Sequence, residues 1–200
     1  MPTLVPDIPV PSPPPDPPRK RWTRAECEAF DAQGLLDYER LELIDGDLIQ
    51  KMPKKPRHSI VLALLYEWLA GIFGMRLVNQ ERTIDVSPED NPTNLPEPDL
   101  IVRTRAVSSY PKPADLQLVV EVADTTLRFD LSTKAALYAR AGIREYWVVD
   151  LLDRRIVVDR DPAEGRYRSI AAYSEDETIS PLAQPDRTLK IREIFSEPAA

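Results

Sequence analysis

The segment LQLVVEVA, residues 116–123, constrains the fold of this chain more than any other stretch. Side chains alternate between the two faces of a strand, and both faces of this segment are largely apolar. Such a strand belongs at the centre of a sheet that is covered on both sides. Glu121 is the single acid within it. Burial of an unpartnered carboxylate costs several kcal/mol, so we expect Glu121 to face protein or a cleft and to have a partner there.

The patterns around this strand predict an α/β or α+β fold, with a mixed sheet flanked by helices. Thr23 and Glu26 form a capping-box pattern that begins a short helix. Asp45-Gly46 indicates a two-residue hairpin turn between two strands. The other predicted elements are a helix over 58–73, strands over 76–86, 99–104 and 116–124, a helix over 130–142, paired strands over 144–150 and 154–161, and short C-terminal edge strands within 167–195.

The helix predicted over 130–142 has a signal at each end. Asp130 is expected to cap its first turn, because a side-chain oxygen at this position can accept a hydrogen bond from a free backbone N–H. Gly142 lies just past its end, where a left-handed residue closes many helices. A strand, REYWVVD, follows at once, and its Tyr146 and Trp147 are expected in the core or an interface.

Composition suggests one domain over residues 21–200, preceded by a tail over residues 1–20. Nine of the first twenty residues are proline, and such a segment favours extended backbone and cannot join a core. We predict that the tail is disordered or semi-rigid and that it serves as a spacer or binds a proline-recognising partner. No apolar run approaches the roughly 20 residues that cross a bilayer, and the first residues lack a signal-peptide pattern. We therefore expect a cytoplasmic protein without a membrane partner.

Single cysteine and histidine residues, Cys27 and His58, limit the metal chemistry that is possible. They exclude an internal disulfide, a cysteine-based zinc site and a multi-histidine site. A hard cation held by oxygen ligands remains possible, since acids are plentiful. The net charge of −7 argues against a protein that coats nucleic acid by bulk attraction, although a local basic patch is compatible with it.

Asp99 and Glu121 are the acids whose positions suggest a site. Asp99 opens one predicted strand and Glu121 lies within the next. If these strands are neighbours, the two carboxylates converge at one edge, where a magnesium ion would remove their repulsion. Such an ion can polarise a phosphoryl oxygen and activate water. The alternatives are that Asp99 caps backbone amides and that Glu121 forms a buried salt bridge with Lys134 or an arginine.

Four segments, PEPDLIV, LVVEVADTT, DLSTKAALYARAGIREYWVVD and the upstream YERLELIDGDL, resemble the PD-(D/E)XK nuclease superfamily. More narrowly, they resemble its Uma group of bacterial restriction-endonuclease-like proteins. The resemblance runs from about Tyr38 to Asp150 with the segments in the family's order. It implies a restriction-endonuclease-like core of a helix, three strands, a helix and a strand. It also implies that Asp99 and Glu121 ligate Mg²⁺ or Mn²⁺.

The chain departs from the superfamily pattern at Ala123, where a lysine is usual. The Uma-like pattern offers a lysine on the following helix instead, which here is Lys134. Ala123 is small and leaves room for that ammonium, which would orient or help deprotonate the attacking water. Glu42 matches the family's acidic position before the hairpin turn, as a metal ligand or a water holder. The alternatives are a solvated helix lysine and an exposed strand acid.

Other residues carry weaker signals. Tyr138 lies four residues after Lys134, on the same helical face, where it bonds a site carboxylate or packs in the core. His58 is expected near the site, as a phosphate contact or proton relay, or else in packing at the helix N-terminus. The segment KMPKKPRH gathers four basic side chains that could cradle a nucleic-acid backbone or form a solvated loop: Lys51, Lys54, Lys55 and Arg57.

Together these residues predict a magnesium-dependent endonuclease that hydrolyses phosphodiester bonds in DNA. Double-strand cleavage by a subunit with one site would favour a homodimer. One rival is a nucleic-acid-binding or accessory protein with the same fold and no efficient cleavage. A second rival is a structural interaction protein in which the acids and Lys134 form only a buried ion-pair network.

Overall fold

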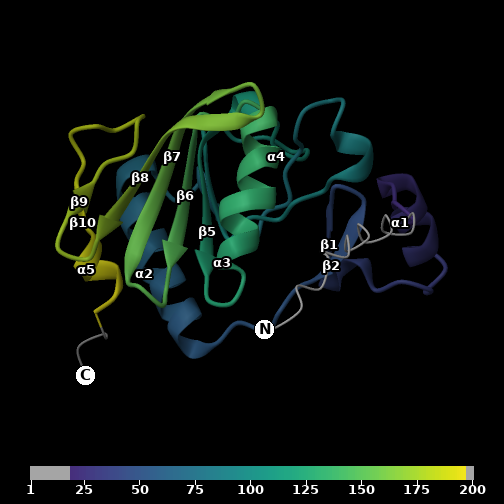
Figure 1. Cartoon of the computed structure of the whole chain (residues 1–200), viewed down its shortest axis with the longest axis horizontal. Coiled ribbons are helices and arrows are strands. Elements are labelled where there is room, and N and C mark those ends of the chain that lie inside the picture. Colours follow the sequence, from purple (N-terminus) through teal and green to yellow (C-terminus); the bar gives the residue numbers. More distant parts are fainter. Residues whose placement is uncertain (1–18, 197–200) are drawn as a thin grey trace, which may run out of the picture.

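The fold centres on one six-stranded sheet with the order β3-β4-β5-β6-β7-β8 (Figure 1). A computed structural model describes residues 19–196, so the predicted tail over 1–20 lies almost wholly outside the described residues. The strands are β3 (Val78–Gln80), β4 (Leu100–Arg103), β5 (Leu116–Ala123), β6 (Glu145–Asp150), β7 (Arg155–Ala163) and β8 (Arg166–Ser174). The predicted mixed sheet flanked by helices is thereby confirmed.

β5 is the central strand, as its two apolar faces predict. It pairs with β4 in antiparallel and with β6 in parallel orientation, whereas the other neighbours in the sheet are antiparallel. A parallel pair needs a crossover connection, and the helical segment between β5 and β6 provides it. This connection carries Lys134 back over the strand that holds Glu121.

Helices cover both faces of the sheet (Figure 1). On one face, α2 (Pro56–Phe73) and α5 (Ile191–Ile194) pack against Leu118, Val120 and Val122. On the other face, α4 (Ala135–Arg140) packs against Val119 and Ala123. Glu121 shares the α4 face because it alternates with the residues that point toward α2.

The N-terminal elements lie beside the sheet and confirm two local predictions. They are α1 (Arg24–Asp31), β1 (Leu41–Ile44) and β2 (Asp47–Gln50). The hydroxyl of Thr23 accepts from the Glu26 N–H, and the Glu26 carboxylate accepts from the Thr23 N–H. Asp45 and Gly46 have φ values of 46° and 78°, as a primed hairpin turn requires. A bridge between Leu43 and Leu95 joins the hairpin to the segment before β4.

The crossover helix corrects one prediction. It begins with α3 (Leu127–Phe129), continues through a π-helical segment (Asp130–Lys134) and ends with α4. Asp130 is therefore inside the helix, not its N-cap, and its backbone N–H donates to the Thr126 carbonyl at 3.0 Å. The expected glycine closure is confirmed, since Gly142 follows α4 with a φ of 76°.

Two other segments differ from the prediction. The strand expected over 76–86 is only Val78–Gln80, because the Ile84 N–H donates to the Pro96 carbonyl and leaves the ladder. Toward the C-terminus, β8 is nine residues long, while β9 (Thr178–Ile179) and β10 (Leu189–Lys190) are short. Residues 191–194 form α5 instead of a strand, with Ile191 and Ile194 buried. Within residues 19–196, no helix combines the length and apolarity needed to cross a membrane.

Candidate active site

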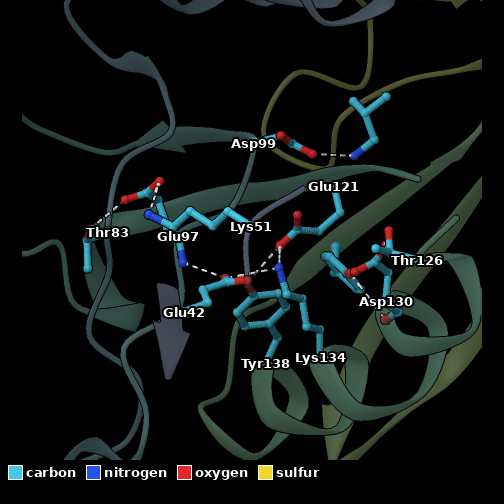
Figure 2. Close-up of polar contacts among 12 residues, drawn as sticks. Glu42, Lys51, Thr83, Glu97, Asp99, Glu121, Thr126, Asp130, Lys134 and Tyr138 are labelled. Atoms are coloured by element: carbon cyan, nitrogen blue, oxygen red, sulfur yellow. Dashed lines mark hydrogen bonds and ion pairs between the residues drawn. The ribbon is translucent and has the colours of Figure 1, made fainter. Parts of the chain in front are cut away.

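Charged side chains from four parts of the chain meet at a cavity of about 500 Å³ (Figure 2). The four parts are β1, the residue before β4, the C-terminal end of β5 and the π-helical segment. The segment between β2 and α2 forms part of its wall. Its charged lining includes Glu42, Asp99, Glu121, Asp130 and Lys134. The strands that carry Asp99 and Glu121 are neighbours, so the sheet brings the two predicted carboxylates to one cavity.

Glu121 has two partners on the crossover helix. The Lys134 ammonium lies 2.9 Å from Glu121 Oε1, and the Tyr138 hydroxyl donates to the same oxygen at 3.0 Å. Glu121 and Lys134 are only 4% and 5% exposed, and the small Ala123 lies beside them on the α4 face of β5. The structure therefore places the Lys134 ammonium on Glu121 from the crossover helix, as predicted.

Glu42 is the second partner of Lys134. Its Oε1 lies 3.0 Å from the Lys134 Nζ and accepts the Glu97 backbone N–H at 2.7 Å. This second contact fixes the carboxylate relative to the segment before β4. Lys134 thus bridges Glu42 and Glu121 (Figure 2). Three N–H donors are available on an ammonium, which leaves one for a water or a substrate oxygen.

Asp99 accepts contacts on both of its oxygens. Oδ2 accepts the Val122 backbone N–H at 2.8 Å and lies 3.5 Å from His58 Nε2, while the Lys54 ammonium is 2.9 Å from Oδ1. Burial raises the pKa of Asp99, but the His58 hydrogen bond and the Lys54 charge lower it more, to about 2. Asp99 is therefore ionised at neutral pH.

Glu121 lies in a different electrostatic environment. Burial raises its pKa well above the usual value, Lys134 opposes this, and nearby Asp130, Asp99 and Glu42 raise the pKa further. Burial lowers the pKa of Lys134, but the charges of Glu121, Glu42 and Asp130 outweigh it, so the net shift is upward and the ammonium stays charged. The site has more carboxylates than cations and would gain from another positive charge.

The donor set fits a magnesium-type cation that keeps water and substrate ligands. Within residues 19–196, no group of three or more His, Cys, Asp or Glu side chains is arranged to hold a metal. Mg²⁺ needs only one or two carboxylates, because water and substrate phosphate complete its shell. Both contacts of Glu121 fall on Oε1, so Oε2 has no hydrogen-bond partner in the described part of the chain. Oε2 and an Asp99 oxygen are suitable ligands.

Not all residues of the predicted basic segment lie at the cavity. Lys51 pairs with Glu97 at 2.8 Å and Lys55 with Asp124 at 2.7 Å. Both lysines line the cavity together with Lys54 and His58, whereas Arg57 is exposed and is not part of its wall. His58 Nδ1 is buried with no hydrogen-bond partner among residues 19–196.

Sequence reasoning missed several acids of this site, among them Asp130 and Glu97. Asp130, predicted as a helix cap, is 3% exposed, accepts from the Thr126 hydroxyl at 2.6 Å and lines the cavity. Burial raises its pKa to about 6 despite the opposing effect of Lys134. Its spacing of four residues from Lys134 was the available signal. Glu97, which holds Lys51, lies in the PEPD segment but had no pattern that separated it from an ordinary loop acid.

Comparisons with known proteins concern the family and the fold of the chain. The model of a family described as "Putative restriction endonuclease" (Uma2) matches residues 28–192. The chain is also similar to a crystal structure described as "a putative nuclease belonging to DUF820" from Anabaena variabilis. The TM-score is 0.63 at 15% identity, over 82% of this chain and 94% of that chain, and a likeness at this identity shows the fold. No curated protein matches.

Proposed function

Because the chain belongs to the Uma2 family of restriction-endonuclease-like proteins, we propose that it is a metal-dependent endonuclease that hydrolyses phosphodiester bonds in DNA. Family membership supports a nuclease-like function. The metal, the substrate and the role of each residue are part of the proposal. The observation that carries it is the Lys134 ammonium on Glu121, beside Asp99 in one cavity.

Asp99 and Glu121 would hold one Mg²⁺ or Mn²⁺ ion. When bound, such an ion polarises a phosphoryl oxygen and lowers the pKa of a coordinated water. The crowding of Glu121 by Asp99, Asp130 and Glu42 supports this assignment, since a divalent cation would offset that repulsion. Glu42 would assist by holding Lys134 in place, since its Oε1 contacts the Lys134 ammonium and accepts the Glu97 N–H.

Lys134 would orient the attacking water with its free N–H and stabilise the negative charge that develops on phosphorus oxygens. Its charged state favours this role over that of a general base. The water oxygen would attack phosphorus and lose its proton to solvent, the bond from phosphorus to one sugar oxygen would break, and that oxygen would take up a proton from another water as it leaves. The products are a terminal phosphate and a hydroxyl. Tyr138 would hold Glu121 in place from Oε1.

A cleavage assay tests this proposal directly. Supercoiled plasmid and linear duplex are incubated with the full chain and Mg²⁺, Mn²⁺ or EDTA. We expect nicking or linearisation with either metal, none with EDTA, and a loss of at least about 100-fold in Asp99→Asn and Glu121→Gln. Equal cleavage by the variants would show a contaminating nuclease and remove the support. DNA binding without cleavage under all conditions would instead favour the accessory-protein alternative.

A cut through both strands in one binding event needs two sites of this kind. We therefore propose that the active form is a homodimer, which light scattering in the presence and absence of a DNA duplex would test. A monomer that linearises plasmid only through accumulated single nicks would contradict the dimer and leave the chemistry intact.

A further inference from the structure

We propose that Lys54 couples metal binding to nucleic-acid binding. In the metal-free protein, the Lys54 ammonium forms an ion pair with Asp99. A divalent cation that binds Asp99 displaces this ammonium, which then becomes available to a phosphate of the substrate. The inference rests on the proposed function and adds to it a substrate-binding residue whose availability the metal controls.

Both carboxylate oxygens of Asp99 already contact other groups of the protein. Oδ2 is held by the Val122 N–H and lies near His58, and Oδ1 is held by Lys54. The Asp99 side chain is 13% exposed, so there is little room for an additional ligand on top of these contacts. A cation can bind Asp99 only if one of the three partners moves.

Only one of these partners is free to move. The Val122 N–H belongs to the central strand β5, and His58 is a buried residue in the first turn of α2. Lys54 lies between β2 and α2 in a stretch without helix or strand, and its side chain is 30% exposed. Displacement of Lys54 therefore leaves the fold intact, whereas displacement of the others would disturb it.

Electrostatics drives the displacement. A divalent cation on Asp99 Oδ1 would replace the Lys54 ammonium at a distance of only 2.9 Å from that oxygen, and like charges so close together repel strongly in a partly buried site. The Lys134 ammonium contacts Oε1 of Glu121, and Oε2 has no hydrogen-bond partner among residues 19–196, so a cation on Oε2 would not have to displace Lys134. The two lysines of the site therefore respond differently to the metal.

Once it is displaced from Asp99, the Lys54 ammonium keeps, among the described residues, only its contact with Glu81, and a substrate phosphate can compete with that contact. Lys54 also contacts Glu81, whose side chain is 53% exposed at the cavity. An exposed ion pair of this kind is weak, so a phosphate entering the cavity would compete for the ammonium. Lys51 and Lys55 are paired with Glu97 and Asp124, and among the described residues neither lysine forms an ion pair with Asp99. Their availability to DNA would not change with the metal.

Reciprocal coupling follows from this exchange. Removing the Lys54 charge should strengthen metal binding, since no ammonium has to be displaced. It should also weaken the gain in DNA affinity that the metal brings. Lys54→Gln tests both effects, Lys54→Arg restores the charge, and Lys55→Gln is the matched control one residue away.

The experiment uses the full chain. Mn²⁺ affinity is measured by isothermal titration calorimetry without DNA. Affinity for a fluorescein-labelled duplex is measured by anisotropy with EDTA or with Ca²⁺, a gel confirming that the duplex stays intact. We expect Lys54→Gln to bind Mn²⁺ at least threefold more tightly than wild type. We also expect Ca²⁺ to raise the DNA affinity of wild type at least fivefold and that of Lys54→Gln by a clearly smaller factor, which the direct contact between metal and phosphate alone provides.

Lys54→Arg should resemble wild type in both assays. Lys55→Gln should keep wild-type Mn²⁺ affinity and lose DNA affinity equally with and without Ca²⁺. If wild type binds Mn²⁺ and Lys54→Gln binds it no more tightly, the exchange is refuted while the proposed metal site stands. If neither protein binds Mn²⁺, the metal part of the proposed function is refuted, and the exchange with it.

Discussion

Replacing Lys134 by methionine tests how the buried charges at this site are balanced. Methionine keeps most of the length of the side chain and removes only the ammonium. Lys134 is 5% exposed and lies 2.9 Å from Glu121 and 3.0 Å from Glu42. Removing one partner of a buried pair leaves an uncompensated charge and costs roughly 3–5 kcal/mol. Here two carboxylates lose the same cation, so we expect the unfolding free energy to fall by about that amount.

The loss should depend on pH with a defined sign. The folded pKa of Glu121 is already above its usual value of 4.5, since burial outweighs the charge of Lys134. Without Lys134 it rises further. A carboxyl whose pKa is higher in the folded state binds more protons there, so stability falls as pH rises above about 4.5. The destabilisation in Lys134→Met should therefore be smaller at pH 5 than at pH 8.

Urea unfolding followed by circular dichroism at pH 5 and pH 8 measures both effects. Thermal unfolding should agree: at about 2–4 °C per kcal/mol for a domain of this size, a loss of about 3–5 kcal/mol lowers the melting temperature by roughly 6–20 °C. Glu121→Gln in the Lys134→Met background should recover at least about 1 kcal/mol, because one of the two unpaired charges is then gone. Lys55→Met is the control, since its exposed pair with Asp124 should contribute under about 1 kcal/mol. A loss below about 1 kcal/mol for Lys134→Met, or one independent of pH, would refute this reasoning.

Three further outcomes are expected. Mg²⁺ should raise the melting temperature of wild type by mass action. At an Mg²⁺ concentration of 100 times the dissociation constant, the stabilisation should be about 2.7 kcal/mol. A similar rise in Asp99→Asn would contradict the assigned ligand. Burial raises the pKa of Asp159 to about 6, so its ionisation should destabilise the fold as pH rises from about 4 to 6. Urea unfolding should show Asp159→Asn gaining about 2 kcal/mol relative to wild type over that range, and a constant difference would count against this. Gly142→Ala should lower the unfolding free energy measured in urea by roughly 1 kcal/mol, because its φ is 76°. Steric contact should not add to this cost, since an added Cβ meets no atom within 4 Å. An unchanged midpoint would show that the backbone relaxes there.

Much of the local structure was predictable because it depends on neighbouring residues. The capping box at Thr23, the turn at Asp45-Gly46 and the glycine closure at Gly142 each involve contacts within a few residues. The two apolar faces of residues 116–123 likewise predicted a covered central strand. The same locality explains the error at Asp130, which has the chemistry of a cap but follows three residues that are already helical.

The candidate site was predictable in its residue types but not in its contacts. The sequence by itself determined that Asp99, Glu121 and Lys134 belong to strand and helix positions that could converge. Only the tertiary structure decided that Lys134 joins Glu121 to Glu42 and that Lys54 occupies Asp99. These contacts depend on the pairing of β4 with β5 and on the path of the crossover helix. Strand register and helix placement result from packing between distant segments, so no pattern within one segment could determine them.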